Sequence, residues 1–482
     1  MVVTDSVNPF YLGAFVLYLL IVLAIGVWGY TKTKTKDDFW VYGKNLGKWL
    51  ATWSLVANFF SAVAAIGVIG EFAQTGWAIM VGVNFGLALG MSALYFVSHK
   101  VRELDKVTLP DIVAAVTGRE YARPVTGVIL FGNAWLYLII QLVGAGALVT
   151  AITGVPYQYM VWVIGLVFIA YTVLGGLVSV AWTDLLQGTV MIALMTLTAI
   201  YLVFDLGGLT AMNEQFAAID PAYLTPLGDG AYTLLTIASS IVAFFGTIFT
   251  AQNYVIRINA TKDIETTKFH LAMGGVIIGS FFVVTSILGA ATGVALNNAG
   301  LTVADPDRAF PVLIMQYLPT SIGTVIILGI MSAILSTTDT RLHSIGVTAT
   351  RDIYDYFRPG VSDERQLKIS RATTVVFGLL ATAVGANPPG SIFQLYNFRA
   401  VLLTTALLVP VYVALYWRGL DGRAILASMG FGAAFGVGTQ LIGGSLMGIP
   451  AALLGVGVAL AVLLGGHYAL GYGTRGAEQA SG

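Results

Sequence analysis

A cluster of polar side chains interrupts an apolar stretch past the middle of this 482-residue chain. Ser336, Thr337 and Thr340 supply hydroxyls, and Asp339 supplies a carboxylate. Acids are rare at lipid depth because inserting one costs roughly 3 kcal/mol. Hydroxyl and carboxylate oxygens are also the ligands that small hard cations prefer. The cluster therefore predicts a cation site inside a membrane.

Spacing places these residues on one side of a helix. Ala333, Ser336, Thr337 and Thr340 recur at i, i+3, i+4 and i+7, and Asp339 lies at the edge of that face. The competing interpretation is that each hydroxyl bonds back to its own helix, as serines and threonines in membrane helices often do. Three hydroxyls beside an acid favour the cation site.

A dehydrated cation also needs backbone carbonyls, and a break in a helix can free them. The second apolar span offers such a break: Asn58 and Ser61 lie near its middle, and Gly67 and Gly70 follow. A continuous helix packed through small residues is the alternative, and the sequence leaves both open.

One further acid, Asp184, stands at the start of the sixth span. It follows Gly175 and Gly176, which predict an inner loop before that span. A carboxylate at a helix start is favoured by the helix dipole, so a simple N-terminal cap is a second explanation for Asp184.

Composition requires a membrane around these residues: the chain is 57% hydrophobic and 10% charged, with a mean hydropathy of +0.84 and no Cys. Thirteen apolar runs are long enough to cross about 30 Å of hydrocarbon, and they lack the alternation of barrel strands. The first run lacks the flanks of a signal peptide, so we expect it to be retained. The runs lie near residues 10–30, 49–71, 77–98, 125–151, 157–177, 184–204, 232–252, 270–296, 321–348, 369–386, 393–416, 423–444 and 450–470.

Charge predicts the orientation. Of the 24 Lys and Arg residues, 21 fall in one set of loops, the opposite loops hold only Arg308, and Arg341 and Arg399 lie inside spans. Positive charge marks the cytoplasmic side. We expect a plasma-membrane protein with its N-terminus outside and its C-terminus in the cytoplasm. A net charge of zero predicts no nucleic-acid partner.

The motifs of several enzyme classes are missing from the sequence. It has no G-x-x-x-x-G-K-[ST] loop, no H-E-x-x-H and no G-x-S-x-G. A primary pump and a hydrolase are disfavoured, and we expect neither catalysis nor a cofactor. Secondary transport remains, with proton coupling as one alternative and an ion channel as another, although no repeated filter loop is visible. The chain reads as one membrane domain, in which Gly82, Gly86 and Gly90 predict close helix packing.

Several motifs in order resemble those of the sodium:solute symporter family, from Asp37 to Trp417. They are Gly43-Lys-Asn-Leu-Gly47, Thr108-Leu-Pro-Asp111, Trp182-Thr-Asp-Leu-Leu-Gln187, Gln252-Asn-Tyr-Val-Ile-Arg257, Ser336-Thr-Thr-Asp339 and Arg351-Asp-Ile-Tyr354. The resemblance implies a leucine-transporter-type fold. Its two inverted five-helix repeats would be about 49–204 and 232–416, with peripheral helices at 10–30, 423–444 and 450–470.

The resemblance also implies ion ligands. Matched by motif, the main sodium site would use Ala57, Phe60, Ala333, Ser336 and Thr337. A second cation site, present in some members, would use Asp184, Asp339 and Thr340 together with Ser336. Asp339 stands where two-sodium members carry a hydroxyl, so the sodium stoichiometry stays open, as does the oligomeric state.

The solute positions implied by the resemblance are Ala64, Phe244 and Thr247. They offer few hydrogen bonds, which disfavours a sugar because buried hydroxyls need partners. Arg399 could grip a carboxylate, or could lie at the outer interface and reach water. We expect a sodium-coupled symporter that imports a small organic solute, a carboxylate or an amino acid, by alternating access.

Overall fold

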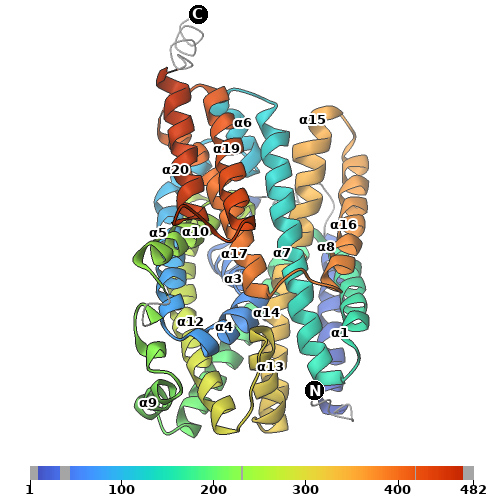
Figure 1. Cartoon of the computed structure of the whole chain (residues 1–482). Coiled ribbons are helices and arrows are strands. Elements are labelled where there is room, and N and C mark those ends of the chain that lie inside the picture. The colour runs from blue at the N-terminus through green and yellow to red at the C-terminus, as the bar shows by residue number, and fades with distance from the viewer. Residues whose placement is uncertain (1–8, 33–43, 229–231, 418, 470–482) are drawn as a thin grey trace, which may run out of the picture.

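The computed structural model describes residues 9–32, 44–228, 232–417 and 419–469, and it is a bundle of long helices (Figure 1). Asp37, Gly43 and residue 470 of the last predicted span lie outside the described residues. The elements are α1 (Pro9–Lys32), α3 (Lys48–Phe59), α4 (Val68–Thr75), α5 (Ala78–Glu103), α6 (Leu109–Thr117), α7 (Ala122–Thr153), α8 (Tyr157–Asp205), α9 (Leu209–Ile219), α10 (Leu234–Phe249), α11 (Gln252–Ala260), α12 (Ile264–Asn298), α13 (Pro306–Gln316), α14 (Thr320–Val347), α15 (Asp355–Phe357), α16 (Asp363–Gly385), α17 (Ile392–Leu403), α18 (Val409–Tyr416), α19 (Gly422–Leu441), β1 (Ser445–Leu446), β2 (Ile449–Pro450) and α20 (Ala451–Leu464), with π-helical turns at Val63–Gly67, Thr348–Tyr354, Thr404–Leu408 and Gly465–Ala469 and a 3₁₀ turn at Pro221–Leu224.

The predicted all-α membrane architecture is confirmed. Within the described residues, ten helices are long and apolar enough to cross a membrane, and the bent pair α3–α4 adds an eleventh. Two shorter apolar segments, Val16–Ile25 and Tyr157–Ala170, coincide with the other two predicted spans. The number of thirteen crossings stays a prediction.

Glycines bring two helices of the bundle into close contact, as the sequence predicted. A Cβ built on Gly82 would lie 2.6 Å from Ser240 Cβ, and one on Gly86 would lie 2.8 Å from Phe244 Cβ. The stripe on α5 therefore lets α10 approach closely, and this contact fixes the position of Phe244.

The predicted inner loop at Gly175 is wrong, because α8 runs as one helix from Tyr157 to Asp205. The run between the two expected spans, 178–183, contains no Pro and no charged residue, so nothing in it forces the helix to end. A glycine pair lowers helix propensity by about 1 kcal/mol per residue, which helix packing can override.

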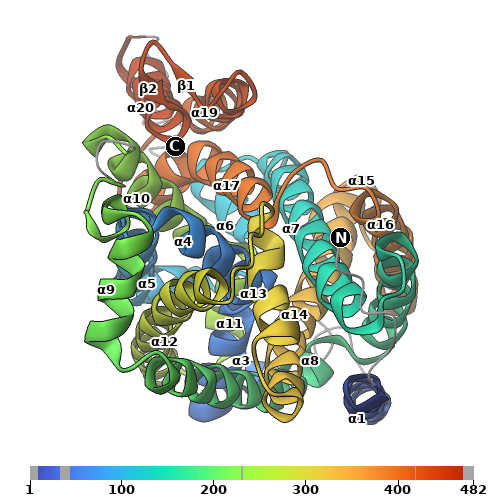
Figure 2. The same ribbon diagram turned by 60° about the horizontal axis from the view of Figure 1, so that its bottom comes forward.

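Two helices near the middle of the bundle are interrupted. Figure 2 shows α3 and α11 inside the ring of longer helices, with α1 and the α19–α20 hairpin at the periphery. The second span divides into α3 and α4, and the seventh continues past α10 into α11. All nine residues of α11 are buried, although the sequence had placed most of that stretch in a loop.

Candidate ion and solute sites

The broken form of the second span is the one found. Helix α3 ends at Phe59, Phe60 is extended with φ −86° and ψ 135°, and the two halves are bent by 54°. At the break, side-chain oxygens accept hydrogen bonds from backbone N–H groups. The Ala62 N–H donates to Gln141 Oε1 at 2.9 Å, and the Val63 N–H donates to Ser61 Oγ at 3.1 Å.

The five residues of the predicted main sodium site meet at this break. Ser336 Oγ donates to the Ala57 carbonyl at 2.9 Å and to the Ala333 carbonyl at 3.0 Å. Thr337 Oγ1 donates to the Phe60 carbonyl at 2.7 Å. All five residues are buried. Three neutral carbonyls and two hydroxyls therefore converge, a donor set that suits a small dehydrated cation.

The residues of the predicted second site also come together, but around a guanidinium. Asp184 Oδ2 accepts from Ser54 Oγ at 2.7 Å and from Arg257 Nη2 at 3.0 Å. The same Nη2 lies 3.1 Å from Thr340 Oγ1, and the Thr340 N–H donates to Asp339 Oδ1 at 2.7 Å. A buried positive group of the protein itself lies among the three predicted ligands.

Two expectations about this network are wrong. Asp184 is not a helix cap, because it lies in the interior of α8 and is fully buried. Arg257 had been counted with the basic loops, yet it is 1% exposed and ion-paired to Asp184. The sequence signal for Arg257 was its place in a polar run, with Gln252 and Asn253 one turn before it.

Arg399 lies in an aromatic cluster and not at the outer interface. It is 2% exposed, and its guanidinium carbon is 4.2 Å from the ring centre of Tyr137 and 4.8 Å from that of Tyr396. The Phe244 ring lies 5.5 Å from that of Tyr396, so Phe244 and Arg399 share one cluster. Arg399 Nε and Nη1 have no hydrogen-bond partner among the described residues.

The other two predicted solute residues flank this cluster. Ala64 belongs to the π-helical turn after the break, which packs against α17, the helix of Arg399. Thr247 lies one turn along α10 from Phe244, and its buried hydroxyl has no partner among the described residues.

Three residues of the buried centre were not predicted as site residues from the sequence: Arg341, Tyr137 and Asn253. Arg341, which the sequence placed inside a span, donates from its Nη1 to Asn253 Oδ1 at 2.6 Å. Its guanidinium carbon also lies 4.3 Å from the ring centre of Tyr137. Asn253 in turn donates to Asn58 Oδ1 at 2.5 Å, which ties α11 to the broken span. The sequence signal that could have identified these residues was the presence of polar side chains within apolar runs.

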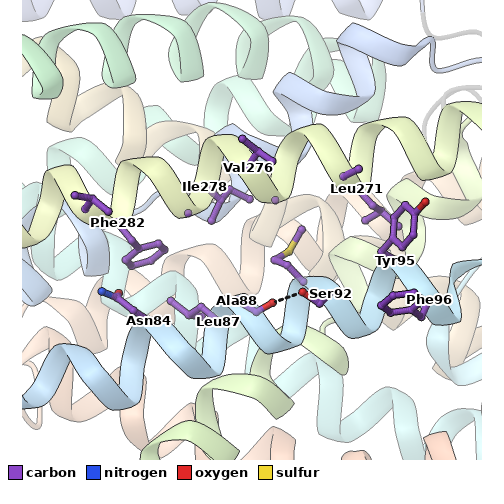
Figure 3. A pocket seen from close by; sticks show the side chains of 15 residues that line it. Asn84, Leu87, Ala88, Ser92, Tyr95, Phe96, Leu271, Val276, Ile278 and Phe282 are labelled. Atoms are coloured by element: carbon purple, nitrogen blue, oxygen red, sulfur yellow. Dashed lines mark hydrogen bonds between the residues drawn. The ribbon is translucent and has the colours of Figure 1, made fainter.

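A surface crevice lies elsewhere, between α5 and α12 (Figure 3). Its lining is mostly apolar, and Ser92 Oγ within it donates to the Ala88 carbonyl of its own helix at 2.9 Å. Such a crevice suits hydrocarbon and not an ion, so we place the chemistry at the buried centre. Among the described residues, no group of three or more His, Cys, Asp or Glu could hold a metal.

Solved transporters share this architecture. A substrate-bound, Na⁺-coupled sialic acid symporter superposes with a TM-score of 0.76 at 20% identity, covering 94% of this chain and 96% of the other. MhsT in complex with L-phenylalanine gives a TM-score of 0.58 at 14% identity, covering 87% and 98%. The fold is thus that of leucine-transporter-type secondary carriers.

The chain belongs to the sodium:solute symporter family, whose model matches residues 39–432. It is a multi-pass, sodium-coupled solute importer. Curated relatives include the osmoregulated proline transporter OpuE of Bacillus subtilis, 26% identical over 87% of this chain and 86% of its own length. The sodium/pantothenate symporter of Haemophilus influenzae is 25% identical, with 86% and 87% covered.

Proposed function

We propose that the solute imported with sodium is a small organic acid, and that Arg399 binds its carboxylate. The observation that carries this proposal is a guanidinium that is 2% exposed and makes no ion pair among the described residues. A buried charge without a partner is strongly destabilising, and a bidentate carboxylate is the partner that a guanidinium accepts best. Proline and pantothenate, named for two relatives, each carry a carboxylate.

The coupling sodium binds to oxygens of Ala57, Phe60, Ala333, Ser336 and Thr337. The hydrogen bonds that join these residues support this assignment. The guanidinium of Arg257 supplies a fixed positive charge beside Asp184, Asp339 and Thr340, so we infer one sodium per cycle. A second sodium, or a proton carried by the two acids, is the alternative.

The orientation is also proposed: N-terminus outside and C-terminus in the cytoplasm, across the plasma membrane. The segregation of basic loops supports it. The experiment for the solute class is a thermal-shift screen of purified protein with carboxylates, amino acids and sugars, in sodium and in potassium. We expect a carboxylate to stabilise the wild type only with sodium, and Arg399→Gln to lose that response. Stabilisation only by solutes without a carboxylate, such as the sugars, would refute the carboxylate assignment.

A further inference from the structure

We propose that the solute is a short dianion, and that Arg341 binds its second acidic group. This inference rests on the proposed function, because it keeps Arg399 in the solute site. It is carried by the placement of two buried guanidinium groups on one aromatic ring, that of Tyr137.

The geometry brings the two cations close together. The guanidinium carbons lie 4.3 Å and 4.2 Å from the centre of the Tyr137 ring, so they are at most 8.5 Å apart. They come from α14 and α17, and Tyr137 comes from α7. The Tyr137 hydroxyl donates to Ser61 Oγ at 2.9 Å, which places the group directly beside the break in the second span.

Neither cation has an acidic partner within the part of the chain that the structure describes. Arg341 is 3% exposed, its Nη1 bonds to a neutral amide, and its Nε has no partner. Arg399 lacks partners at Nε and Nη1. The ring face of Tyr137 attracts both cations, but a cation–π contact contributes much less than a carboxylate does to offset their burial.

Other buried acids are bound elsewhere. Asp184 pairs with Arg257 at 3.0 Å, and Asp111 pairs with Arg351 at 3.0 Å. Asp307 accepts from the Ile392 N–H at 2.8 Å. The two unpaired guanidinium groups therefore await charge from outside the protein.

Charge balance at the centre requires two negative charges. The three guanidinium groups of Arg257, Arg341 and Arg399 exceed the two carboxylates of Asp184 and Asp339 by one, even when both acids are ionised. A bound sodium raises the excess to two. A dianion cancels that excess, a monocarboxylate leaves one cation unmatched, and a zwitterion brings an ammonium next to like charge.

The distance between the cations limits the length of the ligand. Two guanidinium forks no more than 8.5 Å apart can each grip one end of a molecule only a few bonds long. A four-carbon dicarboxylate has that length. The aromatic rings of Phe244 and Tyr396 then cover its apolar middle.

A matched series of ligands tests the inference. Succinate, butyrate and 4-aminobutyrate share a four-carbon chain and differ only in whether the second end is acidic, apolar or cationic. Binding of each is measured by calorimetry on the full chain, in sodium and in potassium. We expect succinate to bind at least tenfold more tightly than the other two, and only with sodium.

Variants then assign the second end to Arg341. Arg341→Gln should lose at least tenfold in succinate affinity and leave butyrate affinity unchanged, so that the preference disappears. Arg341→Lys should retain part of it. Sodium-dependent stabilisation without any acid serves as the folding control. If the variants fail to fold, the comparison of the three ligands on the wild type still tests whether the solute is a dianion.

The outcomes separate this inference from the proposed function. Butyrate or 4-aminobutyrate binding as tightly as succinate, or Arg341→Gln binding succinate as the wild type does, would overturn the dianion while a carboxylate solute stands. Failure of all three acids, with stabilisation by a neutral solute, would overturn both.

Discussion

Three consecutive hydroxyl residues on α14 differ in what they can bind. Thr337 Oγ1 donates across to the Phe60 carbonyl at 2.7 Å, and Ser336 Oγ reaches the Ala57 carbonyl at 2.9 Å. Thr338 Oγ1 instead donates to the Ile334 carbonyl of its own helix at 2.7 Å. Helical phase alone decides which hydroxyls face the broken span. The chain thus contains its own control for a sodium-site experiment.

Removing a ligand oxygen should weaken sodium binding. A hydrogen bond or ligand contact to a charged group contributes about 1.5–3 kcal/mol, so we expect Ser336→Ala and Thr337→Val to raise the sodium concentration for half-maximal thermal stabilisation roughly 10- to 100-fold. Thr338→Val, which removes a bond within one helix, should leave that concentration unchanged. Equal sodium dependence in all three variants would show that the ion binds elsewhere.

The pair of Asp184 and Arg257 should behave as a unit. Asp184→Asn leaves a buried guanidinium without its counter-ion, which should destabilise the protein by about 3–5 kcal/mol. Arg257→Gln added to that variant should recover at least about 1 kcal/mol, because the two residues are coupled. The free energies of unfolding, measured in detergent, give the coupling between the two residues as a double-mutant cycle. Strict additivity, or a sodium titration of wild type with a Hill coefficient near two, would argue against a fixed cation at this position.

The sequence identified some of these residues and not others, for a physical reason. Ala333, Ser336 and Thr337 are recognisable because polar groups stand out in an apolar run. From the sequence, neither Tyr137 nor Arg341 was assigned to a site. Their importance depends on which aromatic ring contacts which guanidinium. Such contacts join α7, α14 and α17, which are far apart in the sequence, so the sequence pattern alone does not predict them.

At the scale of elements, interruptions of helices do most of the positioning. The break between α3 and α4 presents the carbonyls, and the turn from α10 into α11 buries Arg257. The sequence indicated the first break through small residues and glycines. It missed the second because Thr250 and Ala251 carry no turn signal. It also expected a loop inside α8, which is one continuous helix from Tyr157 to Asp205.

The N-terminus of α17 should make stability depend on pH. Asp307, on α13, accepts from the Ile392 N–H. Burial raises the pKa of Asp307 from 3.8 to about 6, opposed by that hydrogen bond and reinforced by the charges of Asp305 and Glu71. Between these pH values the folded state holds more protons than the unfolded state, so the free energy of unfolding falls as pH rises.

The size and the source of that effect can be measured. A rise of the Asp307 pKa from 3.8 to about 6 corresponds to on the order of 3 kcal/mol between pH 4 and pH 7. We expect Asp307→Asn to flatten the decline of the melting temperature over this range. Glu214→Gln, an exposed acid in the α9 segment, should keep the wild-type slope. A variant Asp307→Asn with an unchanged slope would assign the pH dependence to other groups.

At the scale of the whole molecule, charge separates the two ends of the bundle. Figure 1 shows α6 and α15 at the end where α20 finishes, and α9 and α13 at the opposite end. Basic residues Lys106 and Arg119 flank α6, whereas Asp205 and Asp220 flank α9. An electrostatic difference of this kind orients helical membrane proteins during insertion.

The absence of cysteine allows this orientation to be tested without altering the background. Lys106→Cys lies in an exposed position at the basic end, and Glu214→Cys lies in an exposed position at the other end. Because the basic end should be cytoplasmic, a membrane-impermeant maleimide should label Glu214→Cys in intact cells. It should label Lys106→Cys only after permeabilisation. Both variants should react fully once the protein is solubilised, which controls for thiol reactivity. The reverse pattern in intact cells would place the basic loops outside the cell. It would contradict the proposed orientation and, with it, the proposed direction of sodium-driven uptake.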